Sequence, residues 1–344
     1  MRLACDAEFP YKCCIAQDDE MGMMSLDAEK AVPAVGPKIA EDRVALVIPT
    51  LNAAKHLDTL LPALRMQSFQ PRSVLVIDSS STDDTVARFQ AAGAEVVVIP
   101  KSQFDHGGTR QRAVNRLSPR IEVVVFLTQD AVPADSETVA RIVAAFADPE
   151  VGVAYGRQLP HLGAGAIEAH ARLFNYPPES AVLRPQDAAA AGIKASFCSN
   201  SFAAYRRRAL EMVGGFPSGT IFGEDAAVTG RMLLSGWAKA YVADAQVHHS
   251  HCYGLGEEFR RYFDVGVMHA RAPWLLERFG KAEGEGKRFV QSELRHLARH
   301  QPLAIPSAIL RSALKLAAYH CGRREARIPR PLKRRISLNR RYWA

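Results

Sequence analysis

The chain has 344 residues, 48% of them hydrophobic, which provides one large core or two modest ones and excludes an intrinsically disordered protein. Its formal charge is +8, yet residues 301–344 alone hold eleven basic side chains against one acid, Glu325, so the first 300 residues are nearly neutral. We therefore expect an anionic partner to meet the C-terminus. Because the tail lacks interleaved stacking aromatics and any nucleic-acid motif, we predict a membrane surface and no nucleic acid.

Residues 1–42 show no sustained periodicity, and we expect a poorly ordered leader there. No export signal and no run of 18 apolar residues occurs, which predicts a chain that does not span a membrane. The six cysteines lack paired spacing, which favours a reducing compartment. We expect a cytoplasmic protein.

From residue 43 onward, strands alternate with helices. Strands are predicted at 44–48, 73–77, 95–99, 121–127 and 151–155, and helices at 52–67, 83–92, 109–117 and 136–147. Asn52 is expected to cap the first helix, and Ser81 and Thr82 the second. Such alternation predicts an α/β fold with a mostly parallel, Rossmann-like sheet and helices on both faces.

Beyond residue 160 the alternation fails, apart from a helix near 226–235 and a strand near 240–247. We divide the ordered chain at 43–157, 158–253 and a helical, basic region at 254–344. In the last region a helix over 309–319 presents an apolar face opposite Arg311 and Lys315, which is typical of an interfacial helix or of an ordinary docking helix.

Three predicted strands end in short polar segments, at 49–52, 78–83 and 128–130. A single aspartate there is more often a helix cap or a turn former. Since parallel strands deliver their carboxyl ends to one crevice, three such ends together indicate a ligand site.

These segments resemble family 2 glycosyltransferases, whose motifs stand here as V-I-P-T-L-N (47–52), V-I-D-S-S-S-T-D-D-T (76–85) and F-L-T-Q-D (126–130). Within the family the chain looks most like bacterial rhamnosyltransferases of polysaccharide or O-antigen assembly, through F-D-H-G-G-T-R (104–110), L-T-Q-D-A (127–131), V-H-H-S-H (247–251) and the closing 337–343. The resemblance implies a GT-A-type fold, with a nucleotide-binding half at 43–157 and an acceptor half at 158–253.

The donor that the resemblance implies is dTDP-rhamnose, with another pyrimidine-nucleotide sugar such as a UDP-sugar as the alternative. Asp78 would accept a hydrogen bond from the base, although a helix cap is its other interpretation. Arg110 would face the diphosphate, or else form a surface ion pair. The donor-binding residues expected in full are Pro49, Thr50, Asn52, Asp78, Ser80, Arg110, Gln129 and Asp130.

A divalent cation, Mg²⁺ or Mn²⁺, would assist departure of the diphosphate. The family's D-x-D motif is altered here, because Thr128 replaces the first carboxylate while Asp130 keeps the last. In the resemblance the imidazole ligand falls at His249. Strand alternation puts His251 on the same face and His248 on the other, so which histidine binds metal stays open. A zinc site or histidines that only satisfy a turn are the alternatives.

Asp225 matches the general base of the family's E-D motif, at the start of a helix, where paired acids are otherwise partners of the helix dipole. Residues expected on the acceptor side are Asn200, Glu224, Arg231 and His251. The sequence thus predicts an inverting glycosyltransferase that acts on a lipid-linked saccharide at the inner face of the cell membrane. A nucleotide-sugar-binding scaffold that has lost chemistry is the rival interpretation.

Overall fold

The computed structural model describes residues 39–344 except 162, 252 and 281–282. The predicted leader lies outside these residues up to position 38. Glu41–Arg43 form a short 3₁₀ helix, and Glu41 accepts hydrogen bonds from the backbone amides of Gln70 and Arg72. Residues 39–42 of the predicted leader are therefore part of the described structure.

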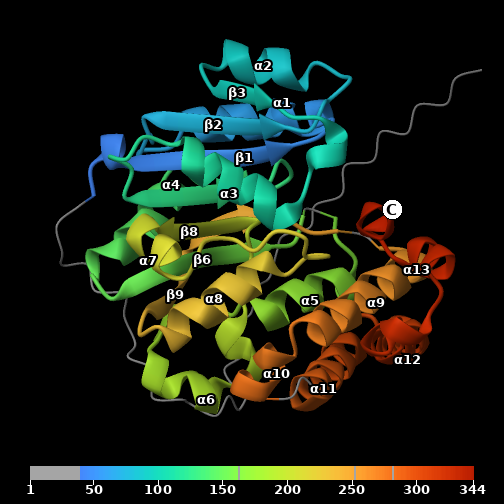
Figure 1. Cartoon of the computed structure of the whole chain (residues 1–344). Coiled ribbons are helices and arrows are strands. Elements are labelled where there is room, and N and C mark those ends of the chain that lie inside the picture. Colours follow the sequence, from blue (N-terminus) through green and yellow to red (C-terminus); the bar gives the residue numbers. More distant parts are fainter. Residues whose placement is uncertain (1–38, 162, 252, 281–282) are drawn as a thin grey trace, which may run out of the picture.

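Within the described residues nine strands form one sheet in the order β3-β2-β1-β4-β8-β6-β9-β5, with β7 beside β9 (Figure 1). The strands are β1 (Val44–Thr50), β2 (Ser73–Asp78), β3 (Glu95–Val98), β4 (Val123–Leu127), β5 (Val132–Pro133), β6 (Val151–Leu159), β7 (Ala181–Leu183), β8 (Phe202–Arg206) and β9 (Ala238–His248).

The first half of the sheet is parallel. Strands β3, β2, β1 and β4 run parallel, and β9 runs parallel to β6. Antiparallel pairs enter through β8, which lies between β4 and β6, and through β5 and β7, which both pair with β9. The predicted α/β class is confirmed. The antiparallel pairs all involve strands that follow β4 along the chain, where strand and helix cease to alternate regularly.

Helices of the first half are α1 (Ala54–Arg65), α2 (Thr85–Ala91), α3 (His106–Arg116) and α4 (Thr138–Ala144); α5 (Ala166–Asn175), α6 (Ala188–Ala191), α7 (Arg207–Met212) and α8 (Glu224–Leu234) follow. The side chains of β1 alternate between two apolar layers. Val44, Leu46 and Ile48 pack with α1 and α4, and Ala45 and Val47 pack with α3 and α8. Each fully buried aliphatic side chain contributes about 1.5–3 kcal/mol, so these layers fix both strand and helix positions.

The predicted capping of α1 and α2 is wrong. Asn52 adopts a left-handed backbone conformation (φ 49°), and its side-chain oxygen accepts from the Thr82 amide near α2. The amides that lead into α1 are bound by Ser81 Oγ, Thr85 Oγ1 and Asp83 Oδ2 from the β2–α2 connection. The segment after β1 thus binds an amide near α2, and the segment after β2 binds the amides that lead into α1. These hydrogen bonds tie the carboxyl ends of β1 and β2 together.

The C-terminal region is helical, as predicted, and consists of α9 (Leu255–Arg271), α10 (Pro273–Phe279), α11 (Glu283–His300), α12 (Ile305–Arg323) and α13 (Arg330–Ile336). Helices α9 and α12 cross closely at Gly266 and Gly322, where a Cβ on either would meet the backbone of the other helix. Asp264 on α9 accepts hydrogen bonds from the amides of Leu338 and Asn339, so the chain end is folded onto α9.

Helix α12 contains the predicted helix 309–319 and leaves its apolar face exposed. Ile309, Leu310 and Leu316 are each more than half exposed. Arg311 and Lys315 turn inward and form ion pairs with Glu258 at 3.0 and 3.5 Å, so they do not present charge to solvent. Across the described part of the chain, we find no helix with the length and apolar character that a membrane crossing requires.

Candidate functional site

The carboxyl ends of β1 and β2 meet at the buried side chain of Asp78. Thr50 and Asp78 are paired in register, and Thr50 Oγ1 donates to Asp78 Oδ2 at 2.8 Å. Ser81 donates twice, from its amide to Oδ1 at 2.8 Å and from its hydroxyl to Oδ2 at 2.5 Å. Asp78 is 0% exposed, so a ligand can reach this carboxylate only if a neighbouring group moves.

Around Asp78, two residues with left-handed backbones shape the edge of the sheet. These are Asn52 (φ 49°) and Ser80 (φ 60°), whose hydroxyl donates to the Ile99 carbonyl. Gln129, at the end of β4, accepts from the Leu51 amide at 2.8 Å and donates to the Leu51 carbonyl at 3.2 Å. Pairs of hydrogen bonds of this kind hold the three predicted strand ends in one wall. Pro49, half-buried, belongs to the same wall.

A second group joins Asp130, His249 and His251. One ligand atom from each lies within 4.8 Å of the other two. Asp130 follows β4 and precedes β5, and β5 pairs with β9 at Val132 and His248, which brings the carboxylate beside the histidines. Asp130 Oδ1 lies 3.5 Å from His249 Nε2, and Oδ2 lies 3.8 Å from His251 Nε2. His248 instead meets the Pro160 carbonyl through Nδ1 at 3.3 Å.

The protonation states of this cluster suit a cation. Burial opposes ionisation of Asp130, but the hydrogen bond and charge of His249 outweigh it and hold the pKa of Asp130 well below its usual range. Burial, with the charge of His249, lowers the pKa of His251 to about 4, although Asp130 acts in the opposite direction. At neutral pH a carboxylate and a neutral imidazole are therefore available, as metal binding requires.

Gln158 and Arg172 orient His249, and sequence reasoning missed both. Gln158 Oε1 accepts from Arg172 at 2.8 Å, so the Nδ1 of His249, 2.9 Å from the same oxygen, must be the donor. Nε2 is then the His249 nitrogen that faces Asp130, 3.5 Å from Oδ1. Gln158 is a polar residue near the end of strand β6, directly after Arg157, and a polar residue at a strand end is the same signal that identified Asp78 and Asp130.

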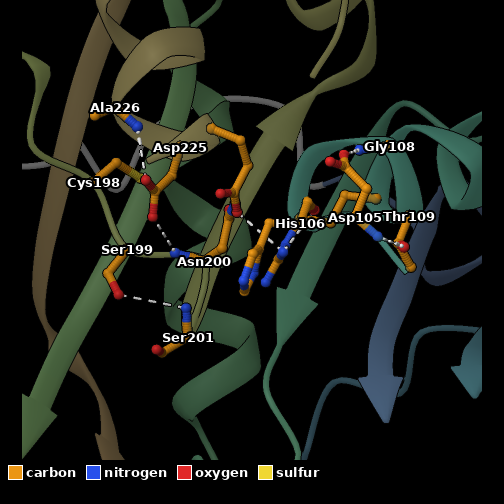
Figure 2. Close-up of polar contacts among 12 residues, drawn as sticks. Asp105, His106, Gly108, Thr109, Cys198, Ser199, Asn200, Ser201, Asp225 and Ala226 are labelled. Atoms are coloured by element: carbon orange, nitrogen blue, oxygen red, sulfur yellow. Dashed lines mark hydrogen bonds and ion pairs between the residues drawn. The ribbon is translucent and has the colours of Figure 1, made fainter. Parts of the chain in front are cut away.

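Asp225 lies at the start of α8, and its carboxylate accepts two backbone amides (Figure 2). The Ala226 amide donates to Oδ1 at 2.8 Å, and the Asn200 amide donates to Oδ2 at 3.2 Å. Burial and the negative charge of Glu224 raise the pKa of Asp225 to about 6. A half-buried carboxylate with its pKa near neutrality is suited to accept a proton from a hydroxyl group.

Glu224 and Arg110 form a buried ion pair behind Asp225. Arg110 Nη1 lies 3.0 Å from Glu224 Oε1, and both side chains are almost fully buried. Asn200 Nδ2 donates to the same oxygen at 2.9 Å, while Asn200 Oδ1 accepts from Tyr205 at 2.7 Å. The alternative interpretation of Arg110 as a surface ion pair is wrong, because its ion pair with Glu224 is buried between α3 and α8. Asn200 thus joins the two acids, because its amide binds the Asp225 carboxylate and its side chain binds Glu224.

Arg231 does not join this group. Its guanidinium donates to the carbonyls of Val213, Gly215 and Ala227, which holds the turn at Gly214 and Gly215 against α8. His251, by contrast, is 37% exposed and open to a ligand.

The comparisons with known proteins agree with this architecture. Residues 45–214 match the model of the glycosyl transferase family 2. The chain is 42% identical over 302 residues to the O-antigen chain rhamnosyltransferase RfbN of Salmonella typhimurium, covering 88% of this chain and 96% of that protein. It is also 42% identical over 299 residues to the rhamnosyltransferase WbaN of Salmonella anatum, covering 87% and 95%.

Among solved structures, the fold is similar to the mannosyltransferase PcManGT from Pyrobaculum calidifontis, whose structure contains GDP-Man and Mn²⁺. The TM-score is 0.52 at 22% sequence identity, covering 83% of this chain and 77% of that one. At this identity the similarity shows the fold alone, and it confirms the GT-A-type architecture. The chain belongs to glycosyl transferase family 2, within which it resembles bacterial O-antigen rhamnosyltransferases, and it is a glycosyltransferase.

Proposed function

We propose that the protein transfers rhamnose from dTDP-rhamnose to a hydroxyl group of a lipid-linked saccharide, with inversion at the anomeric carbon. The observation that carries the proposal is Asp225, a carboxylate with a pKa raised to about 6 and held by two amides at the start of α8. The identity of 42% with two O-antigen rhamnosyltransferases supports the choice of sugar and of acceptor class.

Asp225 acts as the general base. Its ionised carboxylate takes the proton of the acceptor hydroxyl while the oxygen attacks the anomeric carbon from the face opposite the leaving diphosphate. The amides of Asn200 and Ala226 fix the carboxylate, and the Glu224–Arg110 pair behind it sets its basicity. No second carboxylate in the site is needed as a nucleophile, and a single displacement inverts the configuration.

Asp130 and His249 would hold a divalent cation, Mn²⁺ or Mg²⁺, and His251 would complete the protein ligands. The chemistry of this donor set fits such an ion, because one carboxylate and two imidazoles converge within 4.8 Å. The bound ion would supply charge neutralisation for the departing diphosphate. Gln158 keeps the Nε2 of His249 free for this role.

The wall at the ends of β1, β2 and β4 would bind the nucleoside. In this proposal Pro49, Thr50 and Asn52 line the nucleobase, and Asp78 accepts a hydrogen bond from it. Ser80 and Gln129 form the rest of the wall. Asp78 accepts hydrogen bonds from Thr50 and Ser81 and is fully buried, so contact with the nucleobase requires a neighbouring group to move. A UDP-sugar would fit the same wall. Arg110 is held by Glu224. In this proposal it therefore supports the general base, Asp225, more directly than it contacts the diphosphate.

The exposed face of α12 would rest on an anionic membrane. Ile309, Leu310 and Leu316 are 52%, 56% and 56% exposed, and exposed arginines of the same C-terminal region, among them Arg334 and Arg335 on α13, would meet lipid phosphates. Each basic residue near such a surface contributes about 1 kcal/mol. This would place the enzyme on the inner face of the cell membrane, where a lipid-linked acceptor is found.

Vesicle sedimentation tests the membrane contact. We expect the protein to bind vesicles that contain phosphatidylglycerol, and the double variant Ile309→Ser, Leu316→Ser to bind them at least tenfold less, since about 1.5–3 kcal/mol is lost for each side chain. Leu173→Ser on α5, 46% exposed, is the matched control. Equal binding by all three proteins would refute the contact.

Donor turnover tests the reaction itself. The purified protein and Asp225→Asn should be incubated with Mn²⁺, a panel of dTDP- and UDP-sugars and a lipid-diphosphate saccharide. We expect rhamnose transfer by the wild type and a loss of about 10²–10⁴-fold in the variant. If the wild type binds nucleotide but consumes no donor, the protein is a binding scaffold and the proposal fails.

A further inference from the structure

Two segments that lie far apart in the sequence, 104–110 and 337–343, meet in the structure. Asn339 Oδ1 lies 3.3 Å from Nε2 of His106, the first residue of α3. Arg341 donates to the Lys101 carbonyl, just before α3, at 2.8 Å. Of these two segments, only Arg110 has a part in the reaction proposed above.

The buried carboxylate of Asp264 on α9 fixes the orientation of the Asn339 amide. Asp264 Oδ2 accepts from Asn339 Nδ2 at 3.0 Å and from the Asn339 backbone amide at 3.2 Å. The hydroxyl of Ser337 accepts from the same backbone amide at 2.9 Å, and both Asp264 and Ser337 are 0% exposed. Since Nδ2 donates to the carboxylate, Oδ1 is the atom that faces His106, and Nε2 of His106 must be the donor in that contact.

Trp343 anchors the same segment beside the residues that lead into α8. It is buried in one apolar cluster with Ile221 and Phe263, and Phe222 packs against this cluster. The ring centroids of Trp343 and Phe263 are 6.5 Å apart. Ile221 and Phe222 directly precede Gly223, the residue before α8. The 337–343 segment therefore contacts the approaches to both α3 and α8.

The first turn of α3 is packed against the start of α8. A Cβ on Gly107 would lie 3.2 Å from the Glu224 Cβ and would collide with the Pro217 carbonyl, so only glycine permits this approach. Arg110 donates to the His106 carbonyl at 2.9 Å and pairs with Glu224 at 3.0 Å. A displacement of His106 would therefore disturb the ion pair of Arg110 and Glu224.

Asn200 completes the link to the general base. Its side chain donates to Glu224 at 2.9 Å, and its backbone amide donates to Asp225 at 3.2 Å (Figure 2). Energetic coupling between distant residues is carried by contiguous contacts of this kind. In order, the series consists of Asp264, Asn339, His106, Arg110, Glu224, Asn200 and Asp225.

We propose that Asn339 is a positioning residue for the general base, Asp225, and that it acts through His106. It fixes the first turn of α3 and thereby the ion pair of Glu224 and Arg110 behind the base. The inference rests on the proposed function, in which Asp225 takes the proton of the acceptor hydroxyl, and it gives the 337–343 segment a part in that reaction.

Steady-state kinetics of Asn339→Leu, His106→Phe and the double variant test the proposal. We expect each single variant to lower kcat about 10-fold with KM unchanged for both substrates, because a contact that positions the base acts in the transition state and not in binding. The double variant should be no slower than either single variant, whereas independent effects would multiply. His106→Gln keeps an N–H donor for Asn339 and should retain most of the wild-type kcat. Asn115→Leu, the same substitution at the other end of α3, is the matched control and should keep the wild-type kcat.

Hydrogen exchange of backbone amides, followed by mass spectrometry, provides a readout that does not depend on sugar transfer. We expect Asn339→Leu to speed exchange in residues 105–111 and 223–228, and Asn115→Leu to leave exchange in residues 223–228 as in the wild type. If Asn339→Leu does not fold, His106→Phe and His106→Gln test the same contact from α3.

Four results would overturn the inference: unchanged kcat in a folded Asn339→Leu, a raised KM with unchanged kcat, losses that multiply in the double variant, or unchanged exchange in residues 223–228. A wild type that transfers no sugar, while exchange in residues 223–228 still depends on Asn339, would refute the proposed function. The link between Asn339 and the start of α8 would then stand without it.

Discussion

Replacing Glu224 by Gln should move the acid limb of the transfer rate to lower pH. The pKa of Asp225 is raised from 3.8 to about 6 by burial first and by the Glu224 charge second, while Arg110 acts in the opposite direction. The base works only when ionised, so activity is present above this pKa and is lost as the pH falls through it. Without the Glu224 charge, Asp225 stays ionised, and active, at lower pH.

The size of the effect follows from the same pKa. A rise from 3.8 to about 6 corresponds to about 3 kcal/mol against the charged form. Burial, the larger cause, is unchanged in Glu224→Gln, so we expect a shift of about one pH unit, or about 1.4 kcal/mol. The reverse variant, Arg110→Met, removes the opposing charge and should move the acid limb upward.

The assay is kcat/KM for sugar transfer between about pH 4.5 and 8, on protein that circular dichroism shows to be folded. Both variants break the same buried ion pair, and each should lose about 3–5 kcal/mol of stability. A purely structural effect would therefore act on both alike. Shifts of the acid limb in the same direction, or no shift in either, would refute the role of Glu224 and Arg110 in setting the basicity of Asp225.

Three further predictions follow from single contacts. Asp225→Asn should gain up to about 3 kcal/mol of stability relative to the wild type as the pH rises from about 4 to 7.5. The raised pKa of Asp225 means that the wild-type folded state loses stability as this carboxyl group ionises. Urea denaturation measures the difference in unfolding free energy, and a difference independent of pH would contradict the prediction. Gln158→Leu removes the acceptor that fixes His249 Nδ1 and should weaken Mn²⁺ binding about 10- to 100-fold by calorimetry, whereas equal affinity would mean that His249 is oriented otherwise. Gly322→Ala places a methyl group against the Phe263 carbonyl and should lower the free energy of unfolding by about 1–3 kcal/mol, measured by thermal unfolding. Gly256→Ala, which has open space around it, is the control. Similar stability of the two variants would show that α9 and α12 can shift apart.

The residues proposed to carry chemistry stand out in the sequence where a local rule applies to them. Asp78 and Asp130 stand out because parallel strands deliver their ends to one edge, whereas Asp225 is identified through its match to the E-D motif of the family that the chain resembles. Their partners depend on contacts between distant segments. Asp130 meets His249 only because β5, two residues long, pairs with β9, and no periodicity reveals so short a strand.

Capping and charge were less predictable for the same reason. The Ser81–Thr85 segment has the composition of a cap for the helix that follows it, yet its side chains bind the amides that lead into α1. A sequence pattern cannot distinguish a cap of the following helix from a cap of a distant one. The basic C-terminus is typical of a solvated face, but Lys333 forms an ion pair with the buried Glu325 at 2.6 Å, and Glu325 also binds Arg271 on α9. The density of basic residues predicts a charged surface at the C-terminus. Tertiary packing decides which of these side chains remain exposed on it.

The configuration of the product tests the central claim most directly. Rhamnose transferred from dTDP-rhamnose to a lipid-diphosphate saccharide should be analysed by NMR for the coupling constant at the anomeric carbon. A single displacement with Asp225 as base predicts a linkage of the configuration opposite to that in the donor, and a rate about 10²–10⁴-fold lower in Asp225→Asn. A linkage with the configuration of the donor, or full activity of the variant, would contradict the account.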